Sequence, residues 1–372
     1  MHTPILHHYN ESPYAEKARL MLGHKGMPWR SVKVPRIAPK PDLVALTGGY
    51  RKVPVLQIGA DVYCDTRLIA EVLDTLQPEP SLGARSGHFD EIVANWVDTL
   101  LFGRAVGYTF GALADLLPDA LLEDRAALRG APIEREALKR ALPLATQELH
   151  THIAWLDTAL RSPSPFVNGE TPGNGDFTLY ATLWFLANGR FDFSAYPAVQ
   201  HWMTRMTAIG HGQRQDISAE EALVEAAAAL PLPLPSTKHP ADATGLSLGQ
   251  TVQVTPDQLG HGTSVTRELV SLLPHRLTLR LRSARGARAL PAHRLPRQGD
   301  ARHASRLRKQ DARTSPPDAL HLRHVALQRE DPLDPRRQRH CLPRGVPEPR
   351  LPHGPRAAHG RSRPDHAAHP PG

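Results

Sequence analysis

The chain has 372 residues, enough for two or three domains, and a formal net charge of +8 that averages two unlike parts. Residues 1–273 hold 23 basic against 29 acidic residues, whereas residues 274–372 hold 22 against 8. The two cysteines, Cys64 and Cys341, indicate no disulfide framework, no apolar run is long enough to span a membrane, and the N-terminus lacks a signal-peptide pattern, so we expect a soluble cytoplasmic protein.

The pattern of strand-like and helix-like stretches in residues 1–77 predicts an α/β domain. "TPILHHY" reads as a short strand, and Ser12 with Pro13 then begins a helix whose apolar stripe stops at Gly23. "WRSVKV" follows as a strand parallel to the first. "VPVLQIGADVYCD" reads as a hairpin, and Asp65 begins the helix "TRLIAEVLDTL". This order of elements is that of a thioredoxin-like domain over residues 1–77.

The remaining chain divides into four parts. Residues 85–229 have the periodicity of an all-helical domain, and a Pro-rich linker follows at 230–245. Residues 246–281 alternate around Gly turns like two or three strands of a β module, too few to fold alone. Residues 282–372 contain no Phe, Trp, Tyr or Ile among many Arg, Pro and His, so we expect a disordered tail.

Two interpretations of the basic tail stay open. Arg, Pro, Ala, Gly and His all have GC-rich codons, so a frameshift between about residues 270 and 290 of a GC-rich gene would produce this mixture. An intact reading frame on resequencing would exclude it. The other interpretation is a nucleic-acid-binding tail, but the Arg residues are scattered without a repeat or aromatic platforms. Nucleic acid is therefore not an expected partner.

Four motifs in order carry a resemblance to a known family. They are the helix start Ser12-Pro13-Tyr14 with Lys17 and Arg19, the run Val53-Pro54-Val55-Leu56, the pair Asp65-Thr66, and Asn168-Gly169 through Gly175-Asp176-Phe177. Over about residues 1–229 the chain resembles a glutathione S-transferase, a thioredoxin-like domain followed by an all-helical one. One position departs from the family pattern. Gly173 replaces the usual Ser or Thr cap of the core helix, so we expect a cap weaker by a few tenths of a kcal/mol.

The resemblance implies a glutathione site in the first domain. Pro54 looks like the cis-proline of thioredoxin-like folds, next to which the Val53 backbone pairs with the cysteinyl part of glutathione. Thr66 would hold the γ-glutamyl carboxylate, Asp65 the ammonium, and Lys52 the glycyl carboxylate. An ordinary helix cap is the alternative interpretation of Asp65 and Thr66.

The loop Ser12-Pro13-Tyr14-Ala15 looks like a Cys-Pro-Tyr-Cys redox loop without its thiols. It cannot run a two-thiol redox cycle, but a hydroxyl at a helix N-terminus can favour the thiolate of bound glutathione. Lowering that thiol's pKa by about two units needs roughly 2.7 kcal/mol, which one charge-assisted hydrogen bond and a helix dipole supply. Ser12 is the first candidate and Tyr9 the second; alternatively, Ser12 only caps its helix.

Other side chains have weaker signals. Trp96, Phe102 and Tyr108 lie on the first long helix of the second domain, which in the family lines the electrophile pocket, although an ordinary core stripe is the alternative. Cys64 is either near the ligand or a core residue. The adjacent His7 and His8 point to opposite faces of a strand, and we expect no metal site.

We therefore expect an enzyme that uses glutathione as co-substrate to attack a small hydrophobic electrophile, a detoxification chemistry. A lyase, dehalogenase or peroxidase reaction of the same thiolate stays open. The alternative is a non-catalytic binding or regulatory protein on the same fold. The two differ in whether the bound thiol is acidified. The resemblance also implies a homodimer, whose surface the sequence does not show.

Overall fold

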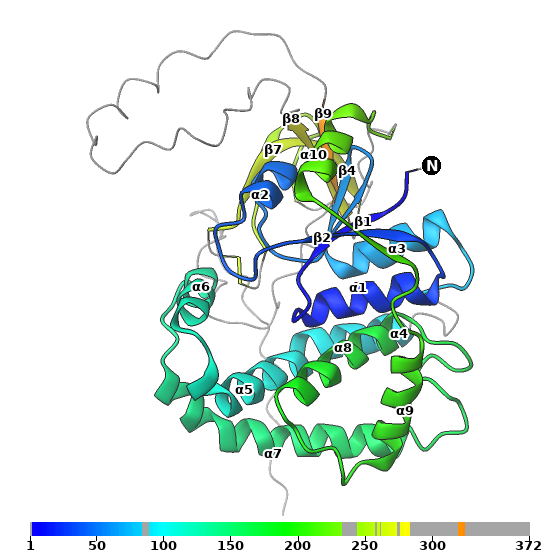
Figure 1. Ribbon diagram of the computed structural model, residues 1–372, viewed down its shortest axis with the longest axis vertical. Coiled ribbons are helices and arrows are strands. Elements are labelled where there is room, and N and C mark those ends of the chain that lie inside the picture. Colours follow the sequence, from blue (N-terminus) through cyan, green and yellow to red (C-terminus); the bar gives the residue numbers. More distant parts are fainter. Residues whose placement is uncertain are drawn as a thin grey trace, which may run out of the picture. The chain divides into compact units, whose positions relative to one another are not determined.

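The first domain contains the sheet that the sequence predicts. Its strands pair in the order β2-β1-β3-β4, with β1 parallel to β2 and the other neighbours antiparallel: β1 (Ile5–His8), β2 (Trp29–Lys33), β3 (Val55–Ile58) and β4 (Asp61–Cys64). Figure 1 shows α1 (Pro13–His24) and α3 (Thr66–Leu76) on one face of the sheet and α2 (Pro41–Thr47) on the other. The thioredoxin-like fold is confirmed.

The computed structural model describes the chain over the ranges 2–83, 89–232, 244–256, 259–260, 262–273, 276–282 and 319–323. All of these residues belong to one compact unit, Met1–Gln328. Most of the Pro-rich linker and most of the predicted tail lie outside the described residues. The predictions made for them, including the frameshift, stay predictions.

The second domain is helical, as predicted. Its elements are α4 (Phe89–Trp96), a π-helical turn (Val97–Leu101), α5 (Phe102–Ala112), a short 3₁₀ turn (Ala114–Leu116), α6 (Asp119–Arg129), α7 (Arg135–Ala159), α8 (Asn174–Asn188) and α9 (Pro197–Ala208). Helix α8 is buried on most sides because it lies between α1, α4, α5 and α9. One hydrophobic core therefore runs from the sheet through α1 into the helical domain.

The helical domain ends earlier than the predicted boundary at residue 229. Strand β5 (Arg214–Ile217) pairs in parallel with β2, and α10 (Ala219–Ala228) packs on α2. Buried Gln57 anchors α10, since its Nε2 donates to the carbonyl oxygen of Ala222 at 2.8 Å. Residues 214–228 thus belong to the sheet domain. Their helical periodicity was readable in the sequence, but the surface that α10 packs on was not.

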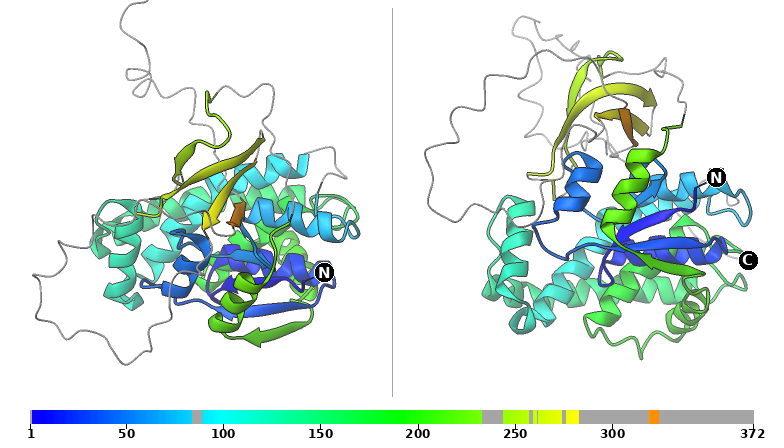
Figure 2. Two further views of the ribbon diagram at one scale, coloured as in Figure 1. Left: turned by 90° about the horizontal axis from the view of Figure 1, so that it is seen from above. Right: turned by 45° about the horizontal axis from the view of Figure 1, so that its top comes forward.

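The predicted β module is present and continues the sheet. Strands β6 (Thr251–Val254), β7 (Val265–Leu273) and β8 (Arg276–Arg282) are antiparallel neighbours, and β9 (Ala319–Arg323) joins β8 to β4. The described strands form one sheet of nine, in the order β5-β2-β1-β3-β4-β9-β8-β7-β6 (Figure 2). Strand β9 lies where the sequence predicted disorder. The module folds on the first domain and not alone.

Candidate functional site

The N-terminus of α1 carries the first candidate hydroxyl. Ser12 caps this helix, because its backbone is extended and its Oγ accepts a hydrogen bond from the N–H of Ala15 at 3.2 Å. Pro13 takes the first helical position, where a missing N–H costs nothing. The cap uses a lone pair of the Ser12 oxygen, so it does not consume the hydroxyl proton. Capping and donation to a ligand are therefore compatible.

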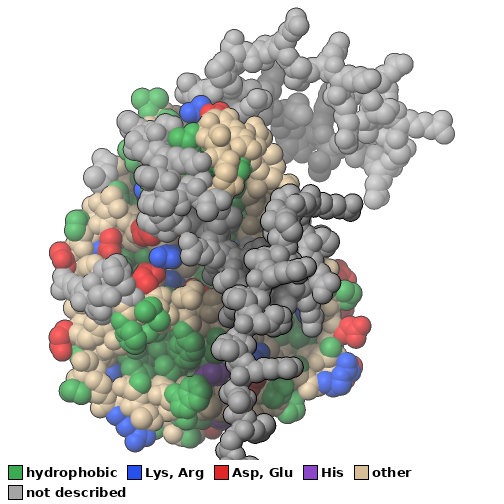
Figure 3. Space-filling model, turned by 180° about the vertical axis from the view of Figure 1, so that it is seen from behind, with side chains coloured by type: hydrophobic (Ala, Val, Ile, Leu, Met, Phe, Trp, Pro, Cys, Tyr) green, Lys and Arg blue, Asp and Glu red, His purple; other side chains and the backbone are tan. Residues whose placement is uncertain are grey.

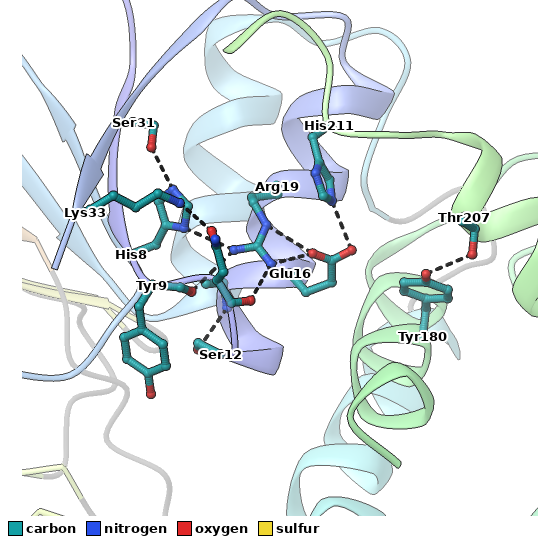
Figure 4. A network of polar contacts seen from close by, with 12 residues as sticks. His8, Tyr9, Ser12, Glu16, Arg19, Ser31, Lys33, Tyr180, Thr207 and His211 are labelled. Atoms are coloured by element: carbon teal, nitrogen blue, oxygen red, sulfur yellow. Dashed lines mark hydrogen bonds and ion pairs between the residues drawn. The ribbon is translucent and has the colours of Figure 1, made fainter. Parts of the chain in front are cut away.

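Tyr9 carries the second candidate hydroxyl and contacts the helical domain. Its hydroxyl accepts from Nη2 of Arg125 on α6 at 3.2 Å, and Nζ of Lys40 lies 5.3 Å from the ring centroid. In Figure 4 the Tyr9 ring points away from Arg19 and Glu16. One short loop therefore presents Tyr9 and Ser12, but the two hydroxyls have different surroundings.

Buried Arg19 of α1 fixes that loop (Figure 4). Its Nε and Nη2 donate to Oε2 of Glu16 at 3.0 and 2.5 Å. Its Nη1 donates to Nδ1 of His8 at 3.0 Å and to the carbonyl oxygen of Tyr9 at 3.4 Å. Its Nη2 also donates to the carbonyl oxygen of Asn10 at 2.9 Å. All five N–H groups of the guanidinium are used, so the buried charge is compensated and the backbone before α1 is held.

Arg19 also determines the tautomer of His8. A guanidinium only donates, so Nδ1 of His8 accepts, and the ring proton lies on Nε2, which donates to Oγ of Ser31 at 3.0 Å. Burial, and then the charge of Arg19, lowers the pKa of His8 to about 3. His8 is therefore neutral at physiological pH and links Arg19 to β2.

His211, which follows α9, closes the network. Its Nε2 lies 3.0 Å from Oε1 of Glu16, and its carbonyl oxygen accepts from Nε1 of Trp29 at 2.7 Å. Burial favours a raised pKa for Glu16, but the hydrogen bond from His211 and the charge of Arg19 outweigh it and hold the pKa below its usual value. Glu16 is thus a carboxylate that ties α1 to the end of the helical domain.

The cis peptide bond and the helix start that the sequence predicted are both present. The peptide bond between Val53 and Pro54 is cis, as predicted, and half-buried Lys52 precedes it. Asp65 caps α3: its Oδ1 accepts from the backbone N–H of the second helical residue at 2.8 Å, and its backbone lies at φ 82°. Asp is among the few non-glycine residues that tolerate such a positive φ. Thr66 begins the helix and is buried.

A buried polar group lies behind these helix starts. The Tyr14 hydroxyl bonds to Asp98 of the π-helical turn, and burial together with the charges of Asp98 and Asp65 raises the pKa of Tyr14. Burial also raises the pKa of Asp98 to about 6, which the charge of buried Lys17 opposes. Acids from α3 and the helical domain therefore interact electrostatically around α1.

The structure adds one cation that the sequence analysis missed. Lys40, just before α2, is only 6% exposed, and burial, with the charge of Arg125, lowers its pKa to about 8. Arg51 and Arg125 both pair with Asp124, with 2.7 Å between Nη1 of Arg51 and Oδ1. Among the described side chains of this corner, three cations surround one carboxylate, which suits an anionic group. Nothing local in "PKPDL" signals a buried lysine, because its neighbours come from distant elements.

Comparisons with known proteins agree with this architecture. Residues 6–81 match the glutathione S-transferase N-terminal domain, and residues 109–205 match the glutathione S-transferase C-terminal domain. The crystal structure of a GST-like protein from Pseudomonas syringae is 32% identical and covers 87% of this chain and 96% of its own, with a TM-score of 0.64. The chain belongs to the glutathione S-transferase family. The P. syringae match is longer than the two transferase domains, so it includes residues beyond them.

Two further transferase structures show lower similarity. A glutathione S-transferase from Rhodospirillum rubrum is 21% identical and covers 55% of this chain and 88% of its own, with a TM-score of 0.44. A glutathione transferase homologue from Sulfitobacter, solved with bound glutathione, is 14% identical and covers 56% and 94%, with a TM-score of 0.43. No curated protein matches the sequence.

Of the three residues that the sequence predicted for an electrophile pocket, Phe102 has its ring against Tyr14 of α1. Its ring centroid lies 4.8 Å from that of Tyr14. Trp96 instead packs on a histidine of α7 at 5.9 Å, and Tyr108 on a phenylalanine after α8 at 5.1 Å. A spacing of six residues does not place side chains on one face of an α-helix, and a π-helical turn also lies between Trp96 and Phe102.

Cys64 lies in the hydrophobic core that also packs against Val53. It is a free thiol, fully buried at the end of β4, and burial raises its pKa strongly. Within the described ranges, no group of three His, Cys, Asp or Glu residues could hold a metal ion. Nor does any helix in that part of the chain have the length and apolar character needed to cross a membrane.

The departure from the family pattern at Gly173 has a structural reason. A Cβ there would lie 2.6 Å from Oδ2 of Asp90, a buried residue of α4. Oδ1 of Asp90 accepts from the N–H of Gly175 at 2.5 Å, so a carboxylate of another helix takes the place of the missing hydroxyl. Asp176 supplies the other half of the cap by accepting from the N–H of Gly173 at 3.2 Å. The hydroxyl cap is therefore replaced by two carboxylates, and the expected loss of a few tenths of a kcal/mol stays a prediction.

Proposed function

We propose that this protein binds glutathione and lowers the pKa of its thiol for attack on a small hydrophobic electrophile. The observation that carries the proposal is Ser12 at the N-terminus of α1, whose hydroxyl proton is not used by the cap. That hydroxyl donates to the sulfur, the helix dipole adds to the effect, and the thiol proton leaves to solvent. The thiolate then forms a bond to the electrophilic carbon, and either a leaving group departs with its bonding electron pair or, in an addition, the π electrons move to the neighbouring atom, which takes a proton from solvent. Tyr9, from the same loop, is the second candidate donor.

Glutathione would be held by the backbone next to cis Pro54 and by the N-terminus of α3. The Val53 backbone pairs with the cysteinyl part of glutathione beside cis Pro54, and α3 takes the γ-glutamyl carboxylate at Thr66. Asp65 takes the ammonium. Lys52 and buried Lys40 attract the glycyl carboxylate.

The electrophile occupies the apolar side of the site. Phe102 next to Tyr14 is the aromatic wall that supports this assignment. Conjugation, lyase, dehalogenase and peroxidase reactions all begin from the same thiolate. A cytoplasmic location fits the free, buried thiol of Cys64.

The test is calorimetric titration of glutathione into the full chain, combined with the ultraviolet absorbance of the bound thiolate as a function of pH. We expect binding and a thiol pKa below that of free glutathione. Ser12→Ala is expected to keep binding but to raise the bound thiol's pKa by about one to two units. Tyr9→Phe is the matched comparison. If only Tyr9→Phe shifts that pKa, Tyr9 is the donor. Binding without acidification supports the non-catalytic alternative, and no binding excludes the proposal.

We also propose a homodimer through α4 and α7. Hydrophobic side chains gather on the face drawn in Figure 3. Exposed hydrophobic side chains of these two helices and the turn between α4 and α5 are Phe89, Ile92, Leu100, Leu144 and Trp155. Apolar surface of this kind usually marks an interface. Ile92→Asp is expected to give monomers by light scattering. Leu116→Asp is the control, because Leu116 is equally exposed, 65% against 64%, but lies beyond α5.

A further inference from the structure

The β module packs against the segment that would hold glutathione. Residues 48–54, here called the edge loop, join α2 to β3 and include Lys52 and the cis bond before Pro54. A Cβ on Gly48 would lie 2.8 Å from Cδ2 of Leu281 on β8 and 3.1 Å from Nη2 of Arg267 on β7. Nη2 of Arg267 also donates to the carbonyl oxygen of Gly48 at 3.4 Å. The module therefore touches the backbone of the edge loop directly.

The same contact continues as a shared hydrophobic core. Tyr50 and Val53 of the edge loop pack in one cluster with Leu269, Leu279 and Leu281 of the module. Burial raises the pKa of Tyr50 well above its usual value, which marks how completely this side of the loop is enclosed. The module thus covers the side chains of the loop whose backbone is the proposed ligand edge.

We propose that strands β6–β8 form the back wall of the ligand site and set the position of the edge loop, so that the module tunes the affinity for glutathione. This inference rests on the proposed function. A ligand that pairs with a strand edge gains its affinity from main-chain hydrogen bonds, and these form at lowest entropic cost when the edge is already ordered. Leu281 and Arg267 are positioning residues in this scheme, because they act through the loop and do not touch the ligand.

The first test compares Leu281→Ala with Leu277→Ala in the full chain. Both leucines lie on β8, belong to the shared core and are 3% exposed, so both variants are expected to lower the melting temperature similarly. They differ in position on β8. Leu281 lies next to Gly48 of the edge loop, whereas Leu277 lies four residues, or about 13 Å, from Leu281 along the strand. Only Leu281→Ala is expected to speed hydrogen exchange of the edge-loop amides and to weaken glutathione binding about three- to tenfold.

A second pair of variants changes side chains outside the shared hydrophobic core. Arg267→Ala removes the side chain over Gly48, and Arg280→Ala removes an exposed partner of Glu268 from the neighbouring strand. We expect faster edge-loop exchange in Arg267→Ala alone. Equal exchange rates within both pairs would overturn the proposal. If the unmutated protein does not bind glutathione, the proposed function fails, and the exchange comparison still decides whether the module positions the loop.

Discussion

The N-termini of α8 and α3 satisfy their backbone N–H groups in opposite ways. At α8 two buried carboxylates accept from the helix start and the segment before it: Asp176 from Gly173, Val167 and Asn168, and Asp90 from Gly175. At α3 Asp65 accepts from one N–H, and no other side chain in the described chain accepts from the first turn. A helix start filled by the protein's own acids is structural, whereas one left partly open can receive a ligand carboxylate.

We therefore expect substitutions of acidic residues to have different effects at the two helix starts. Acids at α8 hold the helical domain together, and changing them should cost stability with little effect on binding. The acid at α3 lies at the proposed ligand site, so changing it should cost binding with little effect on stability. The loop before α1 lies between these extremes, because buried Arg19 fixes its backbone while Ser12 and Tyr9 are the proposed donors to the ligand.

The largest effect is expected from Asp176→Ala, which breaks the filled start of α8. The carboxylate accepts from three backbone N–H groups and from Nε1 of Trp202 at 3.0 Å. Removing it leaves two buried and two partly buried donors unpaired, so we expect unfolding to become easier by about 4 kcal/mol in urea denaturation. A loss below about 1 kcal/mol would contradict the structural role of this acid. Glutathione affinity of the folded fraction should not change.

The next effect is expected from Arg19→Lys, which loosens the loop before α1. A lysine keeps the charge but has three donors in place of five, so several buried acceptors lose their bonds. We expect a loss of about 3 kcal/mol in stability and a higher pKa of the bound thiol. Arg30→Lys is the control, because its guanidinium on β2 is partly exposed and pairs with Glu225. Equal losses in the two variants would contradict the special role of Arg19.

Asp65→Asn tests the open start of α3. Asparagine also accepts the cap hydrogen bond and tolerates the positive φ, so stability is expected to change by less than about 0.5 kcal/mol. The ammonium of glutathione loses its charged partner, which should weaken binding about tenfold to a hundredfold in titration calorimetry. Unchanged affinity would show that Asp65 is only a helix cap.

The smallest effect is expected from Asp90→Asn and depends on pH. Burial raises the pKa of Asp90 to about 7, so the folded protein keeps this proton between about pH 4 and 7 while the unfolded chain has lost it. Stability of the unmutated protein must therefore fall as pH rises through that window. The variant still offers an amide oxygen to Gly175 but has no proton to lose. Its free energy of unfolding should therefore fall by about 1–2 kcal/mol less than that of the unmutated protein between pH 5 and 7. Parallel stability curves for the two proteins would refute the raised pKa.

The sequence predicted the features that depend on short stretches of chain. The helix start at Ser12, the cis bond before Pro54 and the start of α3 after Asp65 each follow from residues within one turn. The sequence did not predict features that depend on contacts with residues far away in the chain. Lys40 lies against Tyr9 and near the charges of Arg125 and Asp124 on α6, and the contact of Gly48 with Leu281 joins residues more than 200 positions apart. The π-helical turn between α4 and α5 was not predicted either, because a single such turn has no periodic signal.

The nine-stranded sheet has a consequence for solubility. β4 would be an open edge of the first domain, but β9 and the longer β7 and β8 cover that side. Among the described strands the outermost are β5 and β6, with four residues each, and β5 is largely exposed with Arg214 and Asp216. Short outer strands, and charges such as those of β5, offer poor templates for another chain. Because its longest strand, β7, has a neighbour on each side, we expect little edge-to-edge pairing between copies of this sheet.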